Sequence, residues 1–162
     1  MAIKEIIEPI LQGEPQTYSK IVETEAVKKG MLLMKSSKGK VKPATAAAKI
    51  VGVAMMDAAI GEEVTFAIPG TDFIARLILA ESQTIVEGDS IVAAVTTIAG
   101  VANNGEAGKM ADVTFTAGGA TGPEVSALVT QMRSFVGYSM EEISTGADET
   151  KAIKVRVKGA AI

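Results

Sequence analysis

Short apolar runs alternate with turn residues along most of the chain. Gly, Pro, Asn, Asp and Ser punctuate the runs at intervals that are typical of all-β proteins. The pattern predicts strands at 17–22, 31–34, 41–43, 64–68, 73–79, 90–93 and 111–116. A mainly β protein follows from this periodicity.

One β-pattern occurs twice in the chain. Each copy opens with Val-Gly, has Met at the fifth place and Gly at the eleventh, and then leads into a second strand, at 63–68 and at 152–157. The marker residues are Val51, Gly52, Met55 and Gly61 in one copy and Val136, Gly137, Met140 and Gly146 in the other. We therefore expect two related β-units, at about 17–68 and 73–157, that form a small barrel or sandwich.

The second unit is longer than the first, and we place an insertion at 101–133. Asn103-Asn104-Gly105 predicts a tight turn, and Pro123 and Glu124 predict the start of a helix at about 123–133. This short helix has one apolar face and is expected to cap an open side of the β structure. The face consists of Val125, Leu128, Val129 and Met132, at i, i+3, i+4 and i+7.

Residues 1–16 have the pattern of an N-terminal arm, which leaves residues 17–162 as a single β domain. Ile3, Ile6, Ile7 and Ile10 follow helical spacing, but Pro9 interrupts the run. A helix of under two turns is not stable alone, so the apolar stripe must dock. Docking on its own domain and docking on a partner both remain open.

Composition narrows the possible functions. The chain has 162 residues, of which 48% are apolar and only 4% aromatic, so aliphatic side chains must build the core. The net charge of −3 gives no concentrated positive field for nucleic acid. We interpret the six clustered lysines as solvated surface positions; they are Lys28, Lys29, Lys35, Lys38, Lys40 and Lys42. The lack of a long apolar run or a leader-like start predicts no membrane partner and a soluble, cytosolic product.

The residue types needed for most catalysis are missing. The sequence has no His and no Cys, which removes the commonest general base, the commonest metal ligand and all thiol chemistry. Paired acids such as Glu62-Glu63 and Glu141-Glu142 lie in or beside predicted turns. The glycine-rich run 118–122 lacks the spacing of a nucleotide-binding loop. We expect no catalytic residue, no metal and no cofactor, and interpret the chain as a structural or binding protein rather than an enzyme.

The order of turns and small residues resembles the capsid decoration, or cement, proteins of tailed double-stranded DNA phages. The matching stretch runs from Val27-Lys28-Lys29-Gly30 through Gly39-Lys40-Val41 to 50–68. A weaker second match extends from Phe135-Val136-Gly137 to Val157.

The resemblance implies a small barrel-like or tulip-like fold and a place on the virion, after synthesis in the host cytoplasm. It implies binding to the outer face of an icosahedral shell, where the protein would bridge major capsid protein subunits, commonly as a homotrimer. It also implies an arm that reaches onto the capsid protein. Here the anchors would be Ile3, Ile6, Ile7, Ile10 and Leu11.

Two alternatives remain open. The first is another phage structural subunit, such as a tail-tube or baseplate protein, because these are also β-rich oligomers. The second is a carrier domain of lipoyl or biotinyl type, which needs a modifiable Lys at a hairpin tip. Lys35, in Met34-Lys35-Ser36, is the nearest match to that requirement.

Overall fold

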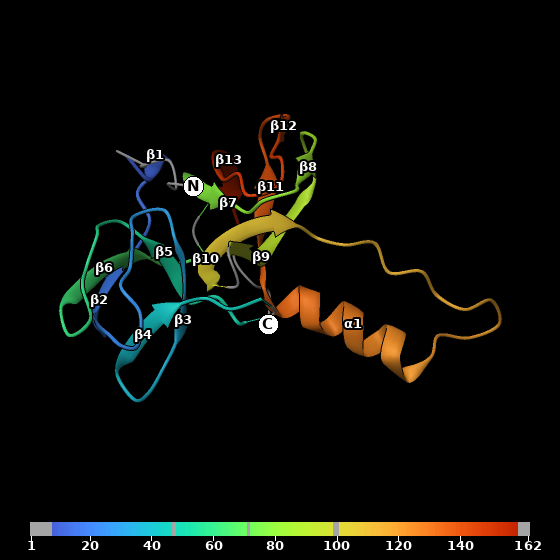
Figure 1. The fold of residues 1–162 in the computed structure, drawn as a ribbon, viewed down its shortest axis with the longest axis horizontal. Coiled ribbons are helices and arrows are strands. Elements are labelled where there is room, and N and C mark those ends of the chain that lie inside the picture. Colours follow the sequence, from blue (N-terminus) through green and yellow to red (C-terminus); the bar gives the residue numbers. More distant parts are fainter. Residues whose placement is uncertain (1–7, 47, 71, 99–100, 159–162) are drawn as a thin grey trace.

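A computed structural model describes residues 8–46, 48–70, 72–98 and 101–158, which form thirteen strands and one helix (Figure 1). The first six strands are β1 (Ile10–Gln12), β2 (Thr17–Val22), β3 (Leu32–Lys35), β4 (Lys40–Pro43), β5 (Gly52–Ala54) and β6 (Glu63–Ala67). They are followed by β7 (Phe73–Leu79), β8 (Thr84–Ile85), β9 (Ser90–Ile98), β10 (Val101–Lys109), α1 (Gly122–Arg133), β11 (Phe135–Ser139), β12 (Ile143–Ser144) and β13 (Lys151–Val157).

The first five strands after β1 close into a barrel in the order β2-β4-β3-β5-β6, which we call the first barrel. β2 and β4 are parallel, and the other pairs, including β2 with β6, are antiparallel. Alternate side chains point inward and form an apolar cluster. This cluster consists of Val22, Val27, Leu33, Val41, Ala54, Ala58, Val64 and Phe66.

The strands of the second half repeat this arrangement. β7 is parallel to β10, and antiparallel pairs then join β10 to β9, β9 to β11, β11 to β13 and β13 back to β7. The order and the directions match those of the first barrel, strand for strand. We call this ring the second barrel. The prediction of a mainly β fold with a small barrel is confirmed, but each half closes a ring of its own, whereas a single barrel built from both units was expected.

Gly52 and Gly137, the glycines of the two Val-Gly pairs, both allow a close approach between neighbouring strands. A Cβ on Gly52 would lie 2.3 Å from Cδ2 of Phe66 and 2.7 Å from the carbonyl oxygen of Ala67. A Cβ on Gly137 would lie 2.0 Å from the carbonyl oxygen of Arg156. Each Val-Gly glycine therefore lets its strand approach the next strand more closely than any side chain allows.

A second apolar cluster, separate from the interior of the first barrel, spans both halves, and we call it the shared core. It contains Leu32, Ile50 and Val53 from the first half together with Leu77, Ile153 and other residues of the second half. Backbone bonds cross the junction as well, from Gly105 N to Ala44 O at 2.7 Å and from Ile78 N to Gly30 O at 3.3 Å. Burial of these apolar side chains holds the two halves together. The predicted division of the chain into an arm and one β domain stays a prediction.

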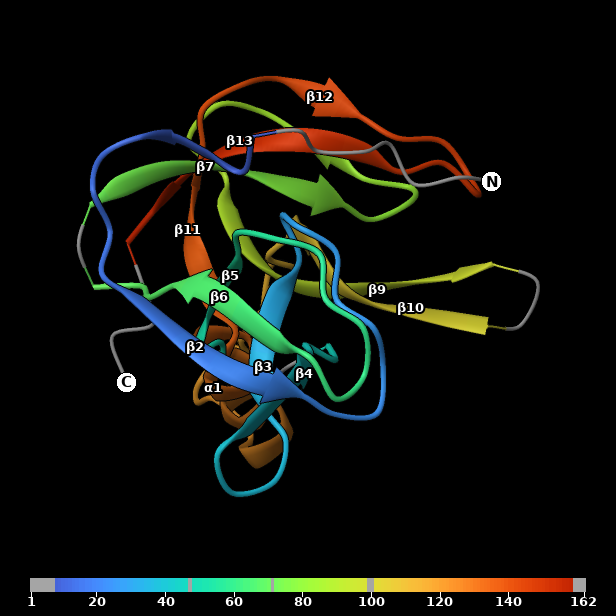
Figure 2. The same cartoon turned by 90° about the vertical axis from the view of Figure 1, so that its left-hand side faces the viewer.

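Figure 2 shows β9 and β10 as a long antiparallel hairpin, which corrects one expectation about the turn at 103–105. That segment lies inside β10, where the register with β9 shifts between Asn103 and Glu106. Gly105 has a φ of 82°, and a Cβ there would lie 3.0 Å from Met31. The Asn-Gly signal thus marks a bulge, which needs the same left-handed glycine as a tight turn.

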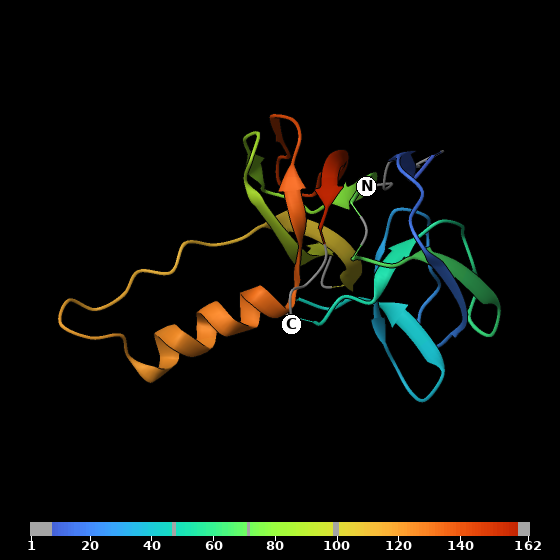
Figure 3. The same ribbon diagram turned by 180° about the vertical axis from the view of Figure 1, so that it is seen from behind.

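Between β10 and β11 the chain leaves the barrels and returns, forming a projection of residues 110–133 that we call the finger (Figures 1 and 3). The predicted helix is confirmed as α1. The strand predicted at 111–116 is wrong, because this segment is extended but pairs with no other strand among the described residues. The first barrel has only residues 44–51 at the corresponding place, between β4 and β5.

The expectation that the helix caps the β structure is also wrong. None of its residues is buried, and it points away from both barrels. The 3.6-residue periodicity reported an apolar face correctly, but periodicity does not identify what covers such a face.

Candidate interaction surfaces

The arm lies against its own barrel over the part that the structure describes. β1 pairs antiparallel with β7, and the amide of Arg76 donates to the carbonyl oxygen of Pro9 at 2.7 Å. The half-buried side chain of Ile10 packs on the shared core, and Leu11 is also half-buried. Both belong to the predicted anchor set. The other members of that set, Ile3, Ile6 and Ile7, lie outside the described residues.

A glycine connects the arm to the barrel. Gly13 has a φ of 96°, in the left-handed region, and a Cβ there would lie 2.9 Å from Cβ of Phe73. Any other residue would push the chain away from β7. The docked position of residues 9–12 is therefore built into the local sequence.

Two side-chain clasps hold the finger together. Near its base, Gln131 makes reciprocal bonds with the backbone of Ala111, from Ala111 N to Oε1 at 2.6 Å and from Nε2 to Ala111 O at 3.1 Å. Near its tip, the carboxylate of Glu124 accepts from Thr116 N and Oγ1, at 3.0 and 2.6 Å, and from Thr121 N at 2.6 Å. These bonds tie the extended segment to α1 along its length.

The tip clasp is also the helix cap. Thr121 Oγ1 accepts from the amide of Glu124 at 3.4 Å, and the Glu124 carboxylate accepts from the amide of Thr121, which makes a capping box. The bonds from the Thr116 hydroxyl, and then from the Thr121 amide, lower the pKa of Glu124 to about 2. A charged carboxylate thus orders the start of the helix and the loop before it.

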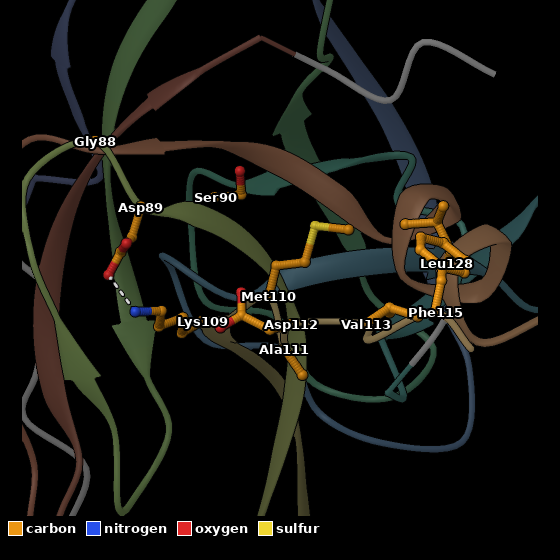
Figure 4. A pocket seen from close by; sticks show the side chains of 10 residues that line it. All are labelled: Gly88, Asp89, Ser90, Lys109, Met110, Ala111, Asp112, Val113, Phe115 and Leu128. Atoms are coloured by element: carbon orange, nitrogen blue, oxygen red, sulfur yellow. Dashed lines mark ion pairs between the residues drawn. The ribbon is translucent and has the colours of Figure 1, made fainter. Parts of the chain in front are cut away.

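A groove of about 380 Å³ runs along the base of the finger (Figure 4). At its barrel end, the ammonium of Lys109 lies 3.0 Å from Oδ2 of Asp89, which also accepts from the amide of Val86 at 2.9 Å. The bond from Val86 and the nearby Lys109 lower the pKa of Asp89. The other end is apolar and is lined by Val113, Phe115 and Leu128.

The finger also carries an apolar surface that nothing covers in the described part of the chain. Val125, Val129 and Met132 are 46%, 37% and 42% exposed, and Phe115 is 46% exposed. We call these four residues the finger stripe. The sequence identified three of them as a helix face, whereas Phe115 was assigned to a strand that does not form.

The clustered lysines lie mainly on the β3–β4 hairpin of the first barrel and beside it. Residues 17–68 contain eight Lys and five acids, so this half is basic within an acidic chain. A hollow of about 350 Å³ opens there onto Val41, Val51 and Phe66, with three lysines at its rim: Lys20, Lys35 and Lys40.

Glu23 orders that hairpin. Its carboxylate accepts from the hydroxyls of Ser36 and Ser37, at 2.5 and 3.0 Å, and lies 3.1 Å from the Lys40 ammonium. These bonds, with Ser36 the strongest, lower its pKa to about 2. Lys35 lies at the end of β3 opposite Val41, within the strand pair rather than at the hairpin tip that a carrier lysine requires.

The paired acids have structural partners. Glu62 accepts from the amide of Ala59 at 2.8 Å, Glu141 from Lys154 at 2.8 Å and Glu149 from Gly146 at 2.7 Å. In each case a carboxylate closes a turn or joins a strand. Within the described ranges, no group of three or more acids is arranged to hold a metal ion. No helix in that part of the chain is long and apolar enough to cross a membrane.

Comparison with known proteins defines the fold class of the chain. No known family model and no curated protein matches it. Among solved structures, it resembles the N base of head fiber gp8.5 in bacteriophage phi29, with a TM-score of 0.55. The match covers 89% of this chain and 94% of that one at 13% identity. The likeness shows that the two proteins share a fold.

Proposed function

We propose that this chain is a structural protein of a phage head. The observation that supports it best is the likeness to a head fiber base over nearly the full length of both chains. The chemistry fits such a role, since the sequence has neither His nor Cys. The carboxylates described above close turns and cap a helix rather than converging on a common point. A protein of this kind needs no bond-making residues and would not be an enzyme.

In the finer form of the proposal, the protein binds the outer surface of an icosahedral shell and bridges major capsid protein subunits, as a homotrimer. The arm is the proposed contact. Residues 9–12 dock on β7 of the second barrel. Ile3, Ile6 and Ile7 then supply apolar side chains for burial on the shell. Many weak sites on one particle would act together and stabilise the assembled shell.

Sedimentation with shells of the phage that encodes the protein tests this proposal. The triple variant Ile3→Ser, Ile6→Ser, Ile7→Ser leaves β1 intact and is expected to lower shell affinity at least about tenfold, because it removes apolar burial. Ile60→Ser is the matched control, since Ile60 is 59% exposed in a turn of the first barrel. Full affinity of the triple variant would reject the arm as the anchor.

Two outcomes would redirect the proposal itself. Failure of the wild-type protein to sediment with shells, together with rings or tubes in electron micrographs, would favour the tail-tube or baseplate alternative. An intact mass with a covalent adduct on Lys35 would favour the carrier alternative.

A further inference from the structure

The finger stripe has the composition of a contact surface rather than of a solvated helix face. A surface helix normally carries charged residues on the side that faces water. α1 has one acid, Glu124 in its first turn, and one base, Arg133 in its last turn, and the stripe between them is uncharged. A helix of twelve residues is marginal in water without tertiary burial, and no residue of α1 is buried.

We propose that the finger stripe pairs with the finger stripe of a second copy, with the two α1 helices antiparallel. An uncharged stripe can face its own copy without like-charge repulsion. The spacing of Val125, Val129 and Met132, at i, i+4 and i+7, is that of a helix–helix seam. The contact is isologous, so the same residues serve both chains.

The charges at the helix ends select the antiparallel direction. In that arrangement Glu124 of one copy lies level with Arg133 of the other along the pair, and the helix dipoles oppose each other. Val125 is then level with Met132 of the second copy, so these stripe residues face each other at both ends of the pair. A parallel pair would instead bring like charges and like dipole ends together.

The shape of the molecule permits this pairing. The N-terminal end of α1 is at the tip of the finger, and its C-terminal end joins β11 at the barrels (Figures 1 and 3). Antiparallel fingers therefore put the two pairs of barrels at opposite ends of the contact. On a shell, such a contact would link neighbouring assemblies, but it is a property of the free protein and does not depend on the proposed function.

The contact is small, so we expect it to be weak in solution. Contacts that bury less than about 1,200 Å² in total belong to the transient class, so we expect a dissociation constant well above that of a stable dimer. Crowding of many copies on one particle would raise the effective concentration and favour the contact.

Sedimentation equilibrium of the purified protein, from about 10 µM to about 1 mM, tests the proposal. The wild-type mass is expected to rise about twofold or more over this range, since every copy in an assembly carries a finger. The triple variant Val125→Ala, Val129→Ala, Met132→Ala is expected to keep its starting mass. Alanine is the best helix former, so loss of the helix cannot explain that result, and circular dichroism checks it. Ile60→Ser, which changes an exposed apolar residue elsewhere, should behave as wild type.

Crosslinking tests the direction of the pair, since the natural chain has no Cys. An oxidised mixture of Val125→Cys and Met132→Cys chains is expected to give the mixed disulfide. Val125→Cys alone should not crosslink, because its two copies would be roughly 10 Å apart along the helices. A disulfide from Val125→Cys alone, a wild-type mass that stays constant, or doubling of the triple variant would each overturn the proposal.

Discussion

The two barrels have the same strand order but differ at one edge. In the parallel pair of each barrel, Val22 of β2 lies opposite Val41 of β4, and Leu79 of β7 lies opposite Ala107 of β10. Val22 and Leu79 are therefore equivalent positions, and they fix the alignment of β2 with β7. In β7, Ile74 and Ala75 are buried and β1 covers the edge. The equivalent residues of β2 are Thr17 and Tyr18, which are exposed, Tyr18 by 62%. The edge that β1 covers therefore has buried apolar side chains, whereas the open edge has the exposed side chains of Thr17 and Tyr18.

The largest expected effect comes from substitution of the repeated glycines. It tests whether the strands approach each other equally closely in the two barrels. Gly137→Ala is expected to cost about 3 kcal/mol of stability or more, because every atom close to the new Cβ belongs to the backbone. Gly52→Ala should cost less, about 1–3 kcal/mol, because the ring of Phe66 can move in part. Denaturant unfolding measures both values.

Gly146→Ala is the matched control for this pair. It lies in the same repeat, and the atom nearest to its Cβ would be a flexible carboxylate oxygen of Glu149 at 3.6 Å. An unfolding midpoint close to wild type is expected. Equal losses of stability in all three alanine variants would mean that the close approach of the strands does not determine the destabilisation.

A smaller effect tests the covered edge against the open one. Ile10→Ala should cost about 1–2 kcal/mol, roughly half the value for a fully buried isoleucine, because Ile10 is half-buried on the shared core. Tyr18→Ala on the open edge of β2 should stay within about 0.5 kcal/mol of wild type. Thermal unfolding of the two variants gives the comparison, and equal losses would contradict it.

The smallest effect is local and depends on pH. Glu23 in the first barrel and Glu124 in the finger both have a pKa lowered from 4.5 to about 2. A lowered folded-state pKa gives stabilisation that is fully present above about pH 4.5 and is lost as the pH falls toward about 2. Amide NMR shifts of Ser37 and Thr116 should follow these two titrations.

Glutamine variants separate the two sites. Glu23→Gln should abolish the titration seen at Ser37 and leave that of Thr116 unchanged, and Glu124→Gln should do the reverse. Glu87→Gln serves as the control, because the Glu87 side chain has no hydrogen-bond partner among the described residues. Transitions that occur together in both variants would indicate global unfolding instead.

Some local elements were predicted accurately from the sequence, although β10 was missed and the strand expected at 111–116 does not form. The bounds of β2 and β7 match the apolar runs that predicted them, and α1 differs by one residue at its start. These elements carry their own signals, which are alternation, a Pro-Glu helix start and a 3.6-residue period. β8 and β12 have only two residues each and no such signal.

Pairing between distant segments could not be read in the same way. The parallel pairs β2–β4 and β7–β10, which help to close each ring, depend on contacts that leave no local pattern. The same limit explains the incorrect position expected for the helix. The stripe residues Val125, Val129 and Met132 signal that something is to be buried, but the partner of such a face lies outside the helix's own sequence.

The core that runs through both barrels has a consequence for how the molecule fails under heat or force. In repeat proteins, stability is approximately a sum of the stabilities of the units and of the interfaces between neighbouring units. Here the first barrel has a cluster of its own, but Leu32 and Leu77 belong to a second cluster that spans both halves. Neither half can therefore open without exposing apolar surface of the other. We expect a single sharp transition in calorimetry. We also expect that force applied to one barrel does not unfold it separately from the other.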